Sequence, residues 1–253
     1  MLEHSEEMVF DMECEILQPW STFIMKTKLP PIIFEKLLKI TDKVSTERKP
    51  HGIEQKESEY FKEFHWLEHS LFERENILEF FINAIKNFAI QQTIQQNPFS
   101  KEMIMNDEWS VNLDEAWIVN QRDNEYLPAH VHARSLVSCV IYLKIPEYLP
   151  VRKPYPTQDR DGAITFISNT TKDPFWGTST LTLEPQLGDF YIFPAALSHF
   201  VYPFRTIDGK GVRRSVAINA KFSSKSMDVQ IYLSIVHIRL QKIGVKVPSQ
   251  IIA

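Results

Sequence analysis

The sequence has few cysteines and no long apolar run. Its 253 residues contain only Cys14 and Cys139, too few for a disulfide framework, and Cys139 lies in an apolar run that suits a reduced, buried thiol. No apolar run approaches the roughly 18 residues that a membrane-spanning helix needs. The acidic N-terminal stretch (Glu3, Glu6 and Glu7) lacks the apolar segment of an export signal. We therefore expect a protein of a reducing cytoplasm with no membrane partner.

The sequence also lacks a strong charge of either sign. Its 28 basic and 32 acidic residues give a net charge of -4, and no Lys/Arg cluster is dense enough to follow a phosphate backbone. Charge therefore does not favour a nucleic acid partner, although it does not exclude a nucleobase as substrate. No internal repeat, low-complexity tract or linker divides the chain. Length and composition predict one domain over residues 1–253.

The first part of the chain, residues 1–107, is expected to support the remainder. Residues 15–28 are rich in β-branched and aromatic residues and predict a strand, whereas residues 32–44 carry an apolar stripe typical of a helix. The charged segment 46–58 predicts an exposed loop. Residues 66–92 predict a second helix with a broad apolar face. Both helices should cover the outside of a sheet.

Short apolar and β-branched runs predict a β-rich core over residues 108–222. The principal runs lie at residues 108–120, 137–143, 163–167 and 190–193. Their lengths and the intervening Pro, Gly, Asn and Asp residues are typical of antiparallel strands. Residues 147–161 and 169–178 predict long irregular loops of the kind that often act as lids. The terminal segment, 223–253, is apolar enough over residues 227–245 for a packing helix or a homodimer contact.

Three histidines in this β-rich part have the spacing of a metal site. His130 and His132 are separated by one residue, and residues i and i+2 of a strand point to the same face. The distant His199 can complete a face of three ligands. Three imidazoles that leave open positions are typical of a catalytic metal site rather than a closed structural one. Taken singly, however, His199 fits a structural role and the pair fits an exposed strand edge without metal.

Six short motifs follow one another across residues 117–222. They are His130-x-His132, Ser138–Leu143, Gly162–Phe166, Pro185-x-x-Gly188-Asp189-x-x-x-Phe193-Pro194, His199-x-Val201-x-Pro203 and Arg213-x-Ser215-x-x-x-Asn219. Their order and spacing, more than any single motif, resemble the 2-oxoglutarate- and Fe(II)-dependent oxygenases. Within this superfamily, the chain is most similar to bacterial and phage oxygenases related to prolyl 4-hydroxylases.

The resemblance implies a fold and a set of iron ligands. The fold is α+β and mainly β, a double-stranded β-helix (the cupin-like jelly roll) supported by the N-terminal helices. The family's His-x-Asp pair and distal histidine, which hold Fe(II), map onto His130, His132 and His199. His132 departs from the family's carboxylate, and a third neutral imidazole leaves the site more cationic. Three acidic residues remain alternative sources of the third ligand: Asp123, Glu125 and Asp161.

The resemblance also implies a cosubstrate site. The family's basic residue, which binds the far carboxylate of 2-oxoglutarate in an Arg-x-Ser pattern, corresponds to Arg213 with Ser215. Strand parity places these two on one face and Arg214 on the other, and a guanidinium fork suits a carboxylate. Four further residues are candidates for hydrogen bonding or packing around the site, although Trp117 suits the core better: Tyr142, Asn219, Asn120 and Trp117.

The implied activity is that of an oxidoreductase, a dioxygenase that couples decarboxylation of 2-oxoglutarate to succinate and CO2 with hydroxylation of a C–H bond. Its partners would be 2-oxoglutarate, O2 and a protein side chain, small molecule or nucleobase, in the cytoplasm of a bacterial or phage-infected cell. One alternative is a cupin-like three-histidine metalloenzyme, which His130-x-His132 favours and Arg213-x-Ser215 disfavours. The other is a non-catalytic binding protein of the same fold.

Overall fold

The computed structural model of this protein describes residues 13–19, 22–47, 63–150, 160–168 and 179–225. Several expectations lie outside these ranges. They concern the N-terminal residues, nearly all of the loop 46–58, most of the loop 147–161, the loop 169–178 and the C-terminal segment 227–245.

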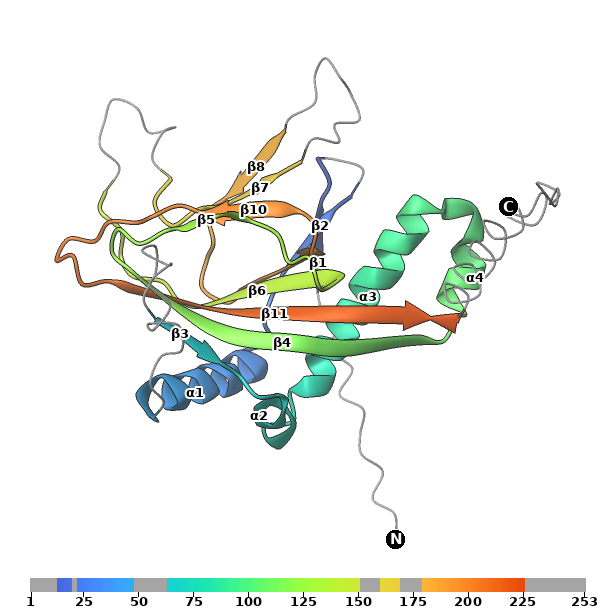
Figure 1. Cartoon of the computed structure of the whole chain (residues 1–253), viewed down its shortest axis with the longest axis horizontal. Coiled ribbons are helices and arrows are strands. Elements are labelled where there is room, and N and C mark those ends of the chain that lie inside the picture. Colours follow the sequence, from blue (N-terminus) through green and yellow to red (C-terminus); the bar gives the residue numbers. More distant parts are fainter. Residues whose placement is uncertain (1–12, 20–21, 48–62, 151–159, 169–178, 226–253) are drawn as a thin grey trace, which may run out of the picture.

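Two antiparallel sheets face each other and form the jelly roll (Figure 1). The larger sheet has the order β1-β2-β9-β6-β11-β4-β3 and the smaller one the order β5-β10-β7-β8. The predicted mainly β, jelly-roll fold is therefore confirmed. The strands are β1 (Cys14–Leu17), β2 (Ile24–Lys28), β3 (Glu63–Trp66), β4 (Trp109–Arg122), β5 (Leu127–His130), β6 (Val137–Lys144), β7 (Ile164–Ile167), β8 (Thr180–Leu183), β9 (Asp189–Pro194), β10 (Ser198–Val201) and β11 (Val212–Ser224).

Helices pack against one face of the larger sheet (Figure 1). The apolar stripe of α1 is buried together with side chains of α3 and of the central strands, including Phe81, Ile118, Ile192 and Val216. The opposite face of the same sheet looks toward the smaller sheet, and the candidate site lies between them. The helices are α1 (Pro31–Glu47), α2 (His69–Arg74), α3 (Leu78–Gln96) and α4 (Lys101–Met105), with a short 3-10 turn η1 (Pro98–Ser100).

The predicted helix over residues 66–92 is wrong in its first part. Residues 63–66 form β3, an edge strand in which His65 pairs with Ile118 and Trp66 with Trp117. The helical stretch is then interrupted after α2, where Asn76 adopts a left-handed φ of 52° that asparagine tolerates better than most residues. A short aromatic run is compatible with the periodicity of a helix and with that of a strand. Pairing with β4, rather than the local sequence pattern, therefore decides its structure.

The prediction of a single strand over residues 15–28 is also corrected. This part of the chain forms two strands, β1 and β2, which pair with each other through Cys14 and Thr27 at one end and Leu17 and Ile24 at the other. Pro19 follows β1, and proline has no backbone N–H to continue a ladder. The hairpin places β2 next to β9 at the side of the larger sheet.

Candidate metal and cosubstrate site

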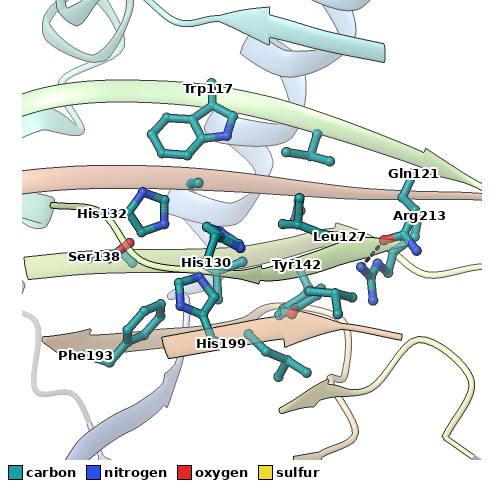
Figure 2. Close-up of a pocket in the computed structure, with 17 residues that line it drawn as sticks. Trp117, Gln121, Leu127, His130, His132, Ser138, Tyr142, Phe193, His199 and Arg213 are labelled. Carbon is teal, nitrogen blue, oxygen red and sulfur yellow. Dashed lines mark hydrogen bonds between the residues drawn. The ribbon is translucent and has the colours of Figure 1, made fainter. Parts of the chain in front are cut away.

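The three predicted histidines come together between the two sheets (Figure 2). His130 ends β5 and His199 lies on β10, where the two residues are direct register partners. Their ring centroids are 4.3 Å apart, and the ring of His132 lies 5.0 Å from His130 and 5.3 Å from His199. One nitrogen of each ring lies within 4.8 Å of the others, so a single metal ion could be shared after small side-chain movements.

His132 reaches this cluster by a route that the sequence did not predict. β5 ends at His130, and His132 lies beyond it, so the alternation of side chains along a strand does not explain their proximity. The backbone N–H of His132 instead donates to the carbonyl of Ala195 at 2.9 Å, and its carbonyl accepts from the N–H of Ser135. A turn tied to the chain just after β9 therefore carries the imidazole back toward the other two.

Backbone carbonyls determine which ring nitrogen is available in two of the histidines. His130 Nδ1 lies 2.8 Å from the carbonyl oxygen of Pro128, and His199 Nδ1 lies 2.9 Å from that of Leu197. A carbonyl oxygen only accepts, so both Nδ1 atoms carry the hydrogen and both Nε2 atoms keep a lone pair. This arrangement is typical of histidines that bind metal ions.

Burial keeps the three imidazoles uncharged. It lowers the pKa of His199 to about 3 and that of His132 to about 4, with a further decrease from the neighbouring His130 in each case. Burial also lowers the pKa of His130, against the opposing effect of its hydrogen bond to Pro128. Neutral imidazole is the form that binds a metal ion, so the lowered pKa values favour that form near neutral pH.

The three carboxylates considered as alternative ligands contact other groups. Asp123 Oδ2 accepts hydrogen bonds from the backbone N–H and the hydroxyl of Thr206, and Asp161 forms an ion pair of 2.9 Å with Arg205. Glu125 Oε2 accepts from the backbone N–H of the last residue of β4. Within the described part of the chain, the histidines form the only group of three or more such side chains placed to hold a metal ion.

Arg213 lines the same cavity, on the far side of Tyr142 from the histidines (Figure 2). It is 2% exposed, and its two terminal nitrogens donate to the carbonyl of Gly162 and to Oε1 of Gln121. The guanidinium carbon lies 5.4 Å from the centre of the Tyr142 ring. Arg213 Nε and the Tyr142 hydroxyl are buried and have no hydrogen-bond partner among the described residues. Leaving buried donors unpaired is costly, so both indicate a missing anionic or polar ligand.

Comparison with known protein families identifies the part of the chain that carries this site. Residues 115–219 match the family described as "Putative 2OG-Fe(II) oxygenase". The match covers less than half of the chain, and over this part the chain is similar to the 2OG-Fe(II) oxygenases. The match includes the three histidines, Arg213 and Ser215. The resemblance seen in the sequence is confirmed. The family match supports an oxidoreductase that uses Fe(II) and 2-oxoglutarate.

Solved structures with a similar fold include three proteins of low sequence identity. A Pseudomonas putida prolyl-4-hydroxylase is 16% identical, with 78% of this chain and 91% of that chain covered and a TM-score of 0.48. A Trichoplax adhaerens prolyl hydroxylase in complex with a hypoxia inducible factor peptide is 12% identical (79% and 83% covered, TM-score 0.47). Streptomyces hygroscopicus HygX with nickel and 2-oxoglutarate bound is 11% identical (80% and 83% covered, TM-score 0.45). The comparison with curated proteins found no match.

The remaining predicted site residues lie in two places. Ser215 and Tyr142 are register partners on β11 and β6 and line the cavity beside Arg213. Asn219, a candidate for hydrogen bonding around the site, lies six residues beyond Arg213 on β11 and contacts His132. Arg214 points to the helix side, as predicted from strand parity, and its Nε donates to Asn120 at 2.7 Å.

Gln121 is a site residue that the sequence analysis missed. It pairs with Arg213 across β4 and β11, accepts a hydrogen bond from the guanidinium, and donates through Nε2 to the carbonyl of Glu125. Trp117, Val119 and Gln121 alternate along β4 and all line the cavity. The predicted strand ended two residues too early, and extending its parity would have found Gln121. Among the described helices, none is long and apolar enough to cross a membrane.

Gly162 is required where the chain closes over Arg213. Its φ is +68°, and a Cβ at this position would collide with the hydroxyl of Tyr148, which hydrogen-bonds Arg213 and packs on Phe204. We predict that Gly162→Ala lowers stability by about 1–3 kcal/mol, because alanine is strained at positive φ and Tyr148 must move. It should also weaken 2-oxoglutarate binding.

Thermal unfolding and titration with 2-oxoglutarate would measure both effects of Gly162→Ala. Gly209→Ala is the matched control, since Gly209 also has a positive φ, of 64°, but a Cβ there meets nothing within 4 Å. The control should lose stability without losing affinity for 2-oxoglutarate. Equal losses of affinity in the two variants would contradict the role of Tyr148.

Proposed function

We propose that this protein is a dioxygenase that hydroxylates a C–H bond of an organic substrate while converting 2-oxoglutarate to succinate and CO2. One observation carries the proposal: a single cavity is lined by three neutral imidazoles and by a buried arginine with an unpaired Nε. The first group suits a divalent metal ion and the second suits a carboxylate. A cosubstrate that binds a metal through one end and an arginine through the other matches this combination.

His130, His132 and His199 would hold Fe(II), which when bound supplies the activation of O2. The tautomers of His130 and His199 already direct Nε2 lone pairs to the cluster. Three neutral imidazoles leave the charge of a divalent ion uncompensated. A dianionic cosubstrate is therefore favoured electrostatically at this site, more than it would be beside a triad containing a carboxylate.

Arg213, Tyr142 and Ser215 would bind the far carboxylate of 2-oxoglutarate. Gly162 and Gln121 each accept a hydrogen bond from one terminal nitrogen of the guanidinium, and the buried Nε–H, which has no partner among the described residues, is a donor for a ligand. Burial raises the pKa of Tyr142 to about 12, partly offset by Arg213, so its hydroxyl remains protonated and able to donate. Charge-assisted hydrogen bonds in a buried site are stronger than in water.

Apolar side chains close the space between the two ends of the cavity. They exclude water from the reacting groups, which limits side reactions. The ring of Phe193 lies 4.9 Å from that of His199 and holds one side of the metal cluster. The apolar lining includes Leu127, Val140, Ile164, Phe193 and Val201.

We also propose that residues 108–222 are the catalytic core of one domain, supported by residues 1–107 and 223–253. A continuous apolar cluster supports this unit, because it joins α1 and α3 to strands of the larger sheet. The substrate would be a protein side chain, a small molecule or a nucleobase. The primary partners would be 2-oxoglutarate and O2, within a monomer or a homodimer.

Succinate production tests the proposed reaction. Supplied with Fe(II), 2-oxoglutarate and O2, the protein should release succinate slowly even without its primary substrate. His69→Ala, a change of a histidine on α2 outside the cluster, should not alter this rate. The absence of both succinate release and 2-oxoglutarate binding, in protein that retains Fe(II), would contradict the proposal.

That same result would favour a second function, a three-histidine metalloenzyme that does not use 2-oxoglutarate. The observation in its favour is the third imidazole at the position of the family's carboxylate. Calorimetric titration of the metal-loaded protein with 2-oxoglutarate separates the two functions. Binding supports the dioxygenase, and metal loading without binding supports the alternative.

A further inference from the structure

His132 is held differently from the other two histidines of the cluster. His130 and His199 each place Nδ1 against a backbone carbonyl, whereas His132 Nδ1 lies 3.2 Å from the side-chain amide nitrogen of Asn219. A carbonyl only accepts hydrogen bonds, but an amide side chain has a donating end and an accepting end. The tautomer is therefore fixed by the backbone in two of the rings and by a side chain in the third.

Asn219 is in turn oriented by Ser138. The hydroxyl of Ser138 donates to Asn219 Oδ1 at 2.9 Å, and the two residues are 1% and 3% exposed. They are register partners on β6 and β11, two central strands of the larger sheet. The pair is therefore held by a rigid part of the fold, whereas His132 lies in the turn after β5.

We propose that Asn219, with Ser138 as its partner, is the positioning residue that sets the tautomer of His132. This rests on the metal centre of the proposed function. As arranged, the amide N–H of Asn219 donates to Nδ1, so neutral His132 carries its hydrogen on Nε2 and cannot offer that nitrogen to a cation. If the Asn219 amide turns over, its Oδ1 accepts a hydrogen bond from His132 Nδ1–H. The hydrogen of the neutral ring is then on Nδ1, and Nε2 has a free lone pair.

The Ser138 hydroxyl permits this exchange without a lost hydrogen bond. A hydroxyl donates to Oδ1 in the first arrangement and accepts from Nδ2 in the second, so both contacts persist. His130 and His199 have no such alternative, because their Nδ1 atoms face carbonyls. His132 thus becomes a ligand only when the Asn219 amide turns, and two histidines form the permanent part of the site.

Nitrogen NMR of the histidine rings tests the tautomer directly and requires no activity. In metal-free wild-type protein, we expect the hydrogen on Nε2 of His132 and on Nδ1 of the other two, with all three on Nδ1 after addition of Zn(II). Asn219→Asp presents oxygens that only accept, so it should place the hydrogen of His132 on Nδ1 before any metal is added. An Nδ1–H on His132 in metal-free wild type, or the same tautomer in wild type and Asn219→Asp, would overturn the proposal.

Co(II) binding measures the consequence for the metal centre. Asn219→Leu should weaken Co(II) binding by about 10–100-fold, the usual cost of removing the partner of a metal-binding histidine. Ser138→Ala should cause a smaller loss, because Asn219 keeps its contact with His132. Asn219→Asp, which preserves size and should fold, is expected to bind Co(II) at least as tightly as wild type.

Thr165→Val is the matched control for these variants. It removes a buried hydroxyl that is 2.8 Å from that of Thr182, on strands of the smaller sheet, and Thr165 is not among the residues that line the cavity. Its Co(II) affinity and ring tautomers should equal those of wild type. Equal Co(II) affinity in wild type and Asn219→Leu would overturn the role of Asn219 and leave the metal centre intact. Failure of wild type itself to bind Co(II) would overturn the metal centre, and the proposal with it.

Discussion

His199→Ala is expected to reduce the affinity for Fe(II) or Co(II) by more than about 100-fold, since loss of a partner of a ligand already costs 10–100-fold. His199 is the most central of the three histidines. It lies on a strand, is 5% exposed, and pairs directly with His130. Its removal leaves two imidazoles, one of them in a turn, and two ligands do not retain a divalent ion as three do.

Equilibrium dialysis with metal analysis measures this loss. The ring of His199 packs on Phe166 and Phe193, so the alanine variant should also be less stable, and its folding must be checked by thermal unfolding. His69→Ala is the control for loss of a histidine outside the site. Retention of a full equivalent of metal by folded His199→Ala would contradict the assignment of the three histidines as ligands.

Arg213→Leu is expected to weaken 2-oxoglutarate binding by about 30- to 4000-fold while metal binding is retained. Removing one partner of a buried, charged hydrogen bond costs about 2–5 kcal/mol, and each 1.4 kcal/mol corresponds to a factor of ten. Arg213 meets this condition because it is 2% exposed and its Nε has no protein partner among the described residues. Arg213 lies on the far side of Tyr142 from the histidines, so its replacement should affect 2-oxoglutarate binding without removing a metal ligand.

Arg122→Leu on the neighbouring strand is the control for a lost arginine. Arg122 is paired with Glu63 at 2.7 Å, and its side chain is 55% exposed, so its removal should change binding little. Arg213→Lys separates charge from shape, because an ammonium cannot reproduce the guanidinium fork and should restore only part of the affinity. Loss of metal with unchanged 2-oxoglutarate affinity in Arg213→Leu would reverse the assignment of the two ends of the cavity.

Local patterns predicted the strands of the core and the side on which their residues point. Arg213 and Ser215 face the cavity and Arg214 faces α1, where it binds Asp42 at 2.6 Å. This succeeded because side chains alternate strictly along a strand. It failed at the ends of elements, where Trp66, the last residue of β3, was taken for the start of a helix and Gln121 for part of a turn. Pairing with a neighbouring strand decides such boundaries, and one sequence does not show that pairing.

The sequence by itself determined the fold class, the family and the set of residues able to carry the chemistry, because strand periodicity and motif order are local properties of the chain. Only the tertiary structure decided how these residues come together in the site. His132 joins the cluster through a turn tied to Ala195, and Asn219 contacts that histidine rather than the arginine. These contacts join residues far apart in the chain, and their geometry follows from the register of strands and the course of a turn rather than from any local pattern.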